Sequence, residues 1–141
     1  MKYILFTLLI SIFSLSAYCQ DTTTVISTSP RWIYIGASDA NDKWYGRSEY
    51  ESKDWDGSIK IWLKLIQPTF TYKKRNYKNS YKVEFAQVDC KGKRMKSLSW
   101  VYYTSAGNVI DKEDYSSGYK PIIPDTVMEM LYEWICEKYK N

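Results

Sequence analysis

The sequence predicts an α+β domain, in which an antiparallel meander sheet of about six strands carries one C-terminal helix tied to it by a disulfide. Three observations lead to this prediction. Apolar and polar residues alternate in several runs separated by short turns, one strong helical pattern follows Pro124, and the cysteines Cys90 and Cys136 fall in a strand-like run and in that helix. An exported chain oxidises such a pair; two buried free thiols are the alternative.

The N-terminus has the pattern of a secretory signal peptide, which we place at residues 1–19. A basic second residue precedes a short apolar core, and Ala17 and Cys19 are small residues at the two positions that a signal peptidase reads. Cleavage is therefore expected before Gln20, and the core is too short for a stable membrane span. Cys19 also leaves a lipid anchor open, but the bulky Tyr18 before it favours soluble export.

The remainder is expected to form one domain. Residues 20–29 are rich in Ser and Thr and predict a flexible linker, so the domain is placed at residues 30–141. Histidine is absent, which excludes Ser-His-Asp and Cys-His catalysis and removes the commonest metal ligand. The net charge of +4 falls to +3 without Lys2, an excess too mild to indicate a nucleic acid partner.

The strand pattern accounts for most of the domain. Its clearest run is 58–66, where Ile59, Ile61, Leu63 and Leu65 alternate with polar or aromatic residues and so form one dry face. The expected strands, in chain order, are residues 31–37, 44–50 (a weaker signal), 58–66, 80–90, 93–104 and 109–112.

Turn and breaker residues separate these strands. Asp56-Gly57 is a strong turn signal before the clearest strand, and Pro68 is expected to end that strand. Residues 69–79 then predict a polar, basic connection. Tight turns at Lys91-Gly92 and around Gly107 join the later strands, which favours a meander.

The C-terminal helix has a clear start signal and one apolar face. Thr126 and Glu129 form a capping-box pattern after Pro124. Cys136 falls at the margin of the apolar arc, where it can reach a sheet. A helix of about 14 residues is expected, and a bridge closing the 46-residue loop from Cys90 would contribute about 4 kcal/mol on the chain-entropy model. The apolar arc consists of Val127, Met130, Leu131, Trp134 and Ile135.

The strand alternation also predicts a second apolar face. If Cys90 faces the helix, so do Val88 and Ala86 in the same strand, while Tyr81, Val83 and Phe85 point to the opposite face. That face is too apolar to lie entirely in water. Sheet curvature, a second copy of the chain or a ligand could cover it, so a strand-mediated homodimer is one expectation.

Several short motifs together resemble the surface-adhesin protein E family. The resemblance rests on the order and spacing of these motifs. They begin with a strand that ends in an acid and a cysteine, and they close with a cysteine in the helix. The motifs are residues 83–90 (VEFAQVDC), Lys93-Arg94, Tyr102 and Tyr103 with residues 107–110 (GNVI), residues 123–126 (IPDT), Leu131 and Cys136. The strand around Trp62 also fits the pattern.

The resemblance implies a six-stranded antiparallel sheet with a C-terminal helix tied to it by a disulfide. It also implies a small envelope or surface protein, often dimeric, that adheres to host extracellular proteins. The expected location is therefore the periplasm, the outer-membrane surface or the exterior of the cell.

One surface segment interleaves cations with aromatic rings and is the candidate binding site. Such a pattern can hold an anionic glycan or an acidic protein segment, and a solvated loop is the alternative. The candidate ligand-binding residues are Phe70, Tyr72, Lys73, Lys74, Arg75, Tyr77 and Lys78.

Two other patterns are interpreted structurally. A second basic cluster around Gly92 is interpreted as charge that protects a sheet edge. Residues 54–57 (DWDG) hint at a calcium loop, but Leu65 stands where a closing Glu is required, so a turn is favoured. The cluster consists of Lys91, Lys93, Arg94 and Lys96.

The sequence therefore predicts an exported, non-enzymatic binding module of the bacterial cell envelope that contacts host or envelope macromolecules. We expect no catalytic residue, no metal and no cofactor. A periplasmic structural or accessory protein without an external ligand is the alternative.

Overall fold

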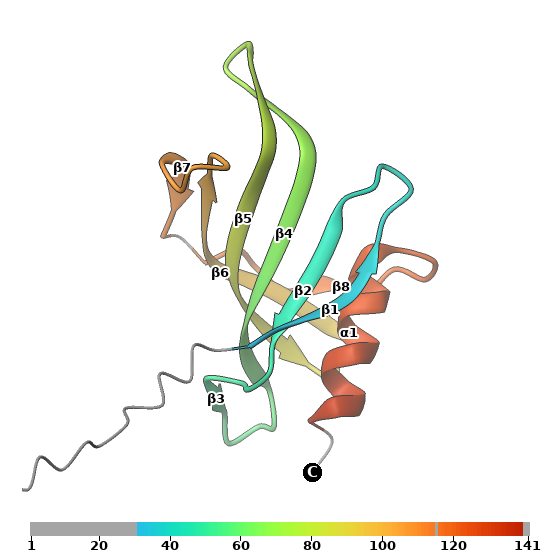
Figure 1. Cartoon of the computed structure of the whole chain (residues 1–141). Coiled ribbons are helices and arrows are strands. Elements are labelled where there is room, and N and C mark those ends of the chain that lie inside the picture. The colour runs from blue at the N-terminus through green and yellow to red at the C-terminus, as the bar shows by residue number, and fades with distance from the viewer. Residues whose placement is uncertain (1–30, 115, 140–141) are drawn as a thin grey trace, which may run out of the picture.

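The computed structural model describes residues 31–114 and 116–139, which form one antiparallel sheet and a helix (Figure 1). The hydrogen-bonded order β1-β2-β4-β5-β6-β7 is a meander, while β3 pairs with β4 and β8 with β6. The predicted signal peptide and linker lie outside the described residues. The elements are β1 (Trp32–Ala37), β2 (Lys43–Arg47), β3 (Ser52–Lys53), β4 (Ile59–Tyr72), β5 (Arg75–Asp89), β6 (Arg94–Tyr103), β7 (Val109–Glu113), β8 (Lys120–Pro121) and α1 (Val127–Lys138).

The predicted fold class is confirmed. The six strands of the meander correspond to the six expected runs, and α1 is the expected helix, with 12 residues. The two-residue strands β3 and β8 were not predicted, because two residues are too few to show an alternating pattern.

The predicted end of β4 at Pro68 is wrong. β4 and β5 stay paired along a long hairpin from Ile59 opposite Val88 to Tyr72 opposite Arg75, so residues 69–79 belong to the two strands and their turn. β2 pairs with β4 only as far as Ile66, and beyond it β4 has a free edge. Proline is tolerated at such an edge, because its missing N–H removes at most one ladder hydrogen bond.

The hairpin closes with a turn for which the sequence carries no recognisable signal. Lys73 and Lys74 are its two central residues, and both have positive φ, 47° and 65°. Two-residue hairpins favour this conformation because its twist matches that of the strands, and Asn-Gly is its usual sequence. Two lysines carry no such signal, so this turn was missed.

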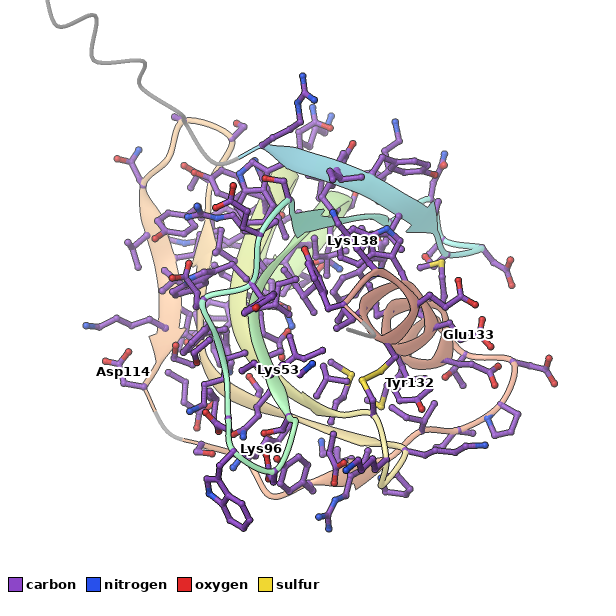
Figure 2. All side chains as sticks on the ribbon, turned by 90° about the horizontal axis from the view of Figure 1, so that it is seen from below. Lys53, Lys96, Asp114, Tyr132, Glu133 and Lys138 are labelled. Carbon is purple, nitrogen blue, oxygen red and sulfur yellow. A yellow bond between two sulfur atoms is a disulfide. The ribbon has the colours of Figure 1, made fainter. Side chains whose placement is uncertain are left out.

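The core lies between α1 and the dry face of the sheet. The alternation predicted for β4 is confirmed, since all four aliphatic residues are buried, and so are Ala86 and Val88 opposite them on β5. Tyr81, Val83 and Phe85 occupy the alternate positions of β5 and are half-buried on the other face. Looking along α1, Figure 2 shows the sheet curving around one side of the helix. The buried core comprises Ile59, Ile61, Leu63, Leu65, Ala86, Val88, Met95, Leu131 and Ile135.

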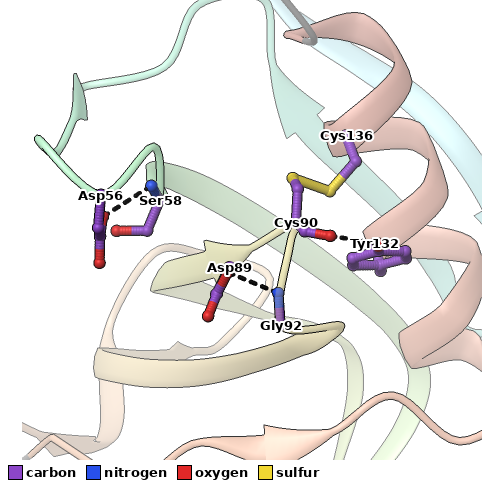
Figure 3. The surroundings of a disulfide bond; sticks show 7 residues. All are labelled: Asp56, Ser58, Asp89, Cys90, Gly92, Tyr132 and Cys136. Atoms are coloured by element: carbon purple, nitrogen blue, oxygen red, sulfur yellow. Dashed lines mark hydrogen bonds between the residues drawn. A yellow bond between two sulfur atoms is a disulfide. The ribbon is translucent and has the colours of Figure 1, made fainter.

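The predicted disulfide is confirmed (Figure 3). Cys90 and Cys136 are bonded with their Cα atoms 5.7 Å apart, and the Tyr132 hydroxyl, one helical turn earlier, donates to the Cys90 carbonyl at 2.8 Å. One covalent and one polar contact therefore join α1 to the residue that follows β5. Nearby, the Asp89 carboxylate accepts from the Gly92 N–H, which holds its pKa below the usual value and orders the turn into β6.

Side chains cap the N-terminus of α1 and tie its C-terminal end to the end of β2. Thr126 accepts from the Glu129 N–H at 3.3 Å, and the Glu129 carboxylate accepts from the Asp125 N–H at 2.7 Å. At the other end, the Tyr139 hydroxyl lies 3.0 Å from the Arg47 and Ser48 carbonyls, and its burial raises the pKa of Tyr139 to about 12.

The helix packs tightly against β2 near its C-terminal end. The Trp134 ring lies directly over Gly46, and any side chain at that position would collide with the ring. Glycine is therefore needed here for the close approach of helix and sheet rather than for an unusual backbone angle.

Candidate functional site

The structure brings all seven candidate binding residues together at the outer end of the β4–β5 hairpin. This end projects away from α1 (Figure 1). We call these seven residues the hairpin tip. They comprise Phe70 and Tyr72 at the end of β4, Lys73 and Lys74 in the turn, and Arg75, Tyr77 and Lys78 at the start of β5.

The rings of the hairpin tip form an ordered cluster around Phe70. Its ring is stacked on Tyr102 of β6, with 4.4 Å between the centroids and 3° between the planes. The Tyr72 and Tyr77 centroids lie 6.2 and 6.4 Å from that of Phe70. Burial raises the pKa of Tyr102. Because Tyr102 belongs to β6, its stack on Phe70 anchors the cluster to the sheet.

Sequence reasoning missed Tyr102 as part of this cluster. It lies 32 positions after Phe70, and only the extension of the hairpin beyond Pro68 brings the two rings together. Finding it would have required both the register of β4 on β5 and the register of β5 on β6.

The four cations of the hairpin tip are exposed. Lys73 lies with its Nζ 4.9 Å from the centre of the Tyr72 ring, and its hydrogen bond to Tyr72 raises the pKa of Lys73. In the part of the chain that the structure describes, no carboxylate lies within ion-pair distance of Lys73, Lys74, Arg75 or Lys78. The site therefore combines unneutralised positive charge with flat apolar surface.

The sequence model of the family described as surface-adhesin protein E matches residues 32–137, which covers the whole sheet and nearly all of α1. This chain belongs to the surface-adhesin protein E family. No curated protein and no solved structure matches it significantly.

Membership in the surface-adhesin protein E family indicates an adhesin-like surface protein with a binding role. The disulfide is consistent with a location outside the cytoplasm, because thiols stay reduced inside it. Among the described residues, no helix is both long and apolar enough to cross a membrane.

Two of the four residues in the second basic cluster contact other side chains of the domain. Arg94 donates to Asp89 at 2.9 Å, and Arg94 and Lys96 both lie over the Tyr119 ring, 4.5 and 4.6 Å from its centre. These contacts join the start of β6 to the segment before β8. The two cations are therefore less available to a partner than those of the hairpin tip.

The 54–57 segment is a turn, as expected. The Asp54 carboxylate accepts from Lys60 at 3.0 Å and from Gln87 at 2.8 Å. Figure 3 shows that Asp56 accepts from the Ser58 N–H, at 2.9 Å. This last bond lowers the pKa of Asp56. Both carboxylates are thus used by protein donors, and the described residues contain no group of three or more ligating side chains that could hold a metal.

The sheet face opposite α1 carries aromatic rings that pair across strands. Trp62 stacks on Phe85 with 4.7 Å between centroids, and Tyr81 stacks on Tyr103 at 4.9 Å. The Lys64 ammonium lies 4.6 Å from the centre of the Tyr81 ring. Such pairing shields part of each ring from water and explains how this second apolar face is partly satisfied within one chain.

A cavity of about 680 Å³ lies beside the disulfide, on the side of α1 that Tyr132 and Glu133 occupy (Figure 2). Its walls carry charges of both signs, so it indicates no single ligand charge. The charged lining residues are Lys53, Lys91, Lys93, Glu133 and Glu137.

Proposed function

We propose that this protein is an exported, non-enzymatic module of the cell envelope that binds acidic protein segments or anionic glycans through the hairpin tip. The observation that carries this proposal is the set of four exposed cations without carboxylate partners, beside stacked rings at the end of a projecting hairpin. The family match supports a surface-binding role.

The geometry of the hairpin tip favours binding in two ways. Adjacent cations attract sulfate or carboxylate groups, and neighbouring rings offer flat surface to a sugar or an aliphatic stem. The Phe70–Tyr102 stack fixes the ring cluster before a ligand arrives, which lowers the entropy lost on binding. Because the cations are exposed, added salt should weaken the contact.

Export is part of the same proposal. It rests on the leader pattern of residues 1–19 and on a disulfide that an oxidising compartment permits. In this proposal residues 20–29 serve as a linker between the signal peptidase cleavage site and the domain.

Removing positive charge from the turn should weaken binding without disturbing the hairpin. The double substitution Lys73→Asn/Lys74→Gly deletes two cations and installs the sequence that this turn conformation prefers. We expect affinity for heparin and for a polyglutamate peptide to fall roughly three- to thirty-fold, given the modest strength of exposed charge contacts. Isothermal titration calorimetry at two salt concentrations measures this.

The matched control is Lys91→Gln/Lys93→Gly, which removes the same charge from the turn at the other end of β5. Lys93 also has positive φ, 48°, so glycine suits that position. Equal losses in both variants would indicate non-specific attraction by net charge. Unchanged affinity in the tip variant would show that the hairpin tip is not the binding site.

Surface proteolysis of intact cells tests the location. A surface-displayed domain should lose its exposed hairpin tip to externally added trypsin, which cleaves after Lys and Arg, while a periplasmic marker protein stays intact. Protection equal to that of the marker would contradict surface display and support the periplasmic accessory role instead.

A further inference from the structure

A second pocket, separate from the hairpin tip, lies between the sheet and the N-terminal half of α1. It has a volume of about 280 Å³, and its apolar walls come from three strands, β2, β4 and β6, and from the helix. Leu63, Met95 and Leu131 form its buried part, and Met128 lines it from the helix. A cavity with such walls excludes water from an apolar ligand group.

The pocket exists because the residues on the helix-facing side of β5 change from small apolar to charged along the strand. Ala86 and Val88 fill the core below α1, but the next residues on that side are Glu84 and Lys82, opposite Leu63 and Leu65 of β4. Glu84 and Lys82 line the pocket and form an ion pair, with side chains only 14% and 16% exposed. Charges this shielded from water are costly in a purely structural position.

The polar groups around this ion pair are poised to receive a ligand. The Lys82 ammonium lies 5.7 Å from the centre of the Trp44 ring and 5.9 Å from that of Tyr102. Among the described residues, the Trp44 Nε1–H and the Ser97 hydroxyl are buried without a hydrogen-bond partner, and both residues line the pocket. Unpartnered donors of this kind cost stability unless something accepts from them.

The charge of the lining indicates the sign of the ligand. Of the three lysines that line the pocket, Lys96 holds its ammonium over the Tyr119 ring, because it occupies the alternate position of β6 from Met95. Lys82 is paired with Glu84, the one acid of the lining, so Lys120 leaves an excess of positive charge. An anionic head group would satisfy this excess and could accept from the unpartnered donors.

From these features we infer that the pocket binds a small anionic amphiphile, a carboxylate with an apolar tail. At about 30 Å³ for each water-sized group, its volume holds roughly nine or ten non-hydrogen atoms, which excludes a two-chain lipid. The tail lies against Leu63, Met95 and Leu131, and the carboxylate lies toward Lys120 and the unpartnered donors of Trp44 and Ser97.

Octanoate, with ten non-hydrogen atoms, is the probe. It is titrated into the oxidised, ¹⁵N-labelled protein, with 1-octanol as the uncharged comparison. We expect saturable shifts of the amide signals around the pocket and of the Trp44 indole N–H signal. The affinity for octanol should be at most about one tenth of the affinity for octanoate. Absence of a saturable shift up to about 20 mM octanoate would overturn the inference.

Two variants locate the site. Met128→Trp fills the pocket and should abolish octanoate binding, whereas Ile123→Trp adds the same ring at an exposed position and should leave it unchanged. Lys120→Gln removes the unpaired cation of the lining and should weaken octanoate about three-fold without affecting octanol. Octanoate binding that survives Met128→Trp, or that is indifferent to Lys120→Gln, would contradict the assignment.

Discussion

Replacing both Cys90 and Cys136 by alanine is expected to lower the free energy of unfolding by about 4 kcal/mol. The bond closes a loop with a sequence separation of 46 residues, and on the chain-entropy model its loss returns that loop's freedom to the unfolded chain. Domains of this size are stable by only about 5–15 kcal/mol, so the variant should approach the limit of folding. Urea unfolding followed by circular dichroism measures the change.

The reduced wild-type protein is the control for this experiment. It lacks the bond but keeps both side chains, so it separates loss of the cross-link from loss of packing at the two half-buried sites. We expect the reduced protein and the double variant to agree within about 1 kcal/mol. A loss below about 1 kcal/mol in both would mean that the Tyr132 hydrogen bond and the core alone hold α1 to the sheet.

Ile135→Ala should be nearly as damaging, with an expected loss of about 3–4 kcal/mol. Ile135 is 0% exposed and belongs to the central core cluster between α1 and the sheet. Removing its outer carbons leaves a cavity that neighbours on a disulfide-tethered helix cannot easily close, so the cost combines lost burial with lost contacts.

The matched control is Ile123→Ala. Ile123 precedes α1, is 60% exposed and loses the same atoms on substitution. We expect its unfolding free energy to stay within about 0.5 kcal/mol of the wild type, as for most surface changes. Similar losses in the two variants would contradict the assignment of Ile135 to the core and of Ile123 to the surface.

The sequence predicted those parts of the molecule that local patterns encode. The alternation in β4 and the capping residues of α1 each appear within a few residues, and both were confirmed. The disulfide was predicted because one cysteine falls in a strand-like run and the other in the helix, and it was confirmed too. The basic and aromatic character of residues 70–78 was also visible, since composition needs no tertiary information.

The shape of the hairpin tip could not be predicted in the same way. Pro68 looks like a strand end because proline normally disrupts a central strand, and only the pairing of β2 shows that this part of β4 is an edge. Likewise, two lysines with positive φ have no sequence signature. The Phe70–Tyr102 stack then depends on both features at once.

The sequence by itself therefore determined the six strands of the meander and the helix, because periodicity and capping act through neighbours in the chain. It also indicated the covalent link, because the two cysteines fall in a strand-like run and in the helix. The tertiary structure alone decided where the basic segment projects, which ring anchors it, and that Lys82 and Glu84 face a pocket below α1. Those outcomes depend on register between strands and on how far one helix covers the sheet, and the energies that set both come from residues distant in sequence.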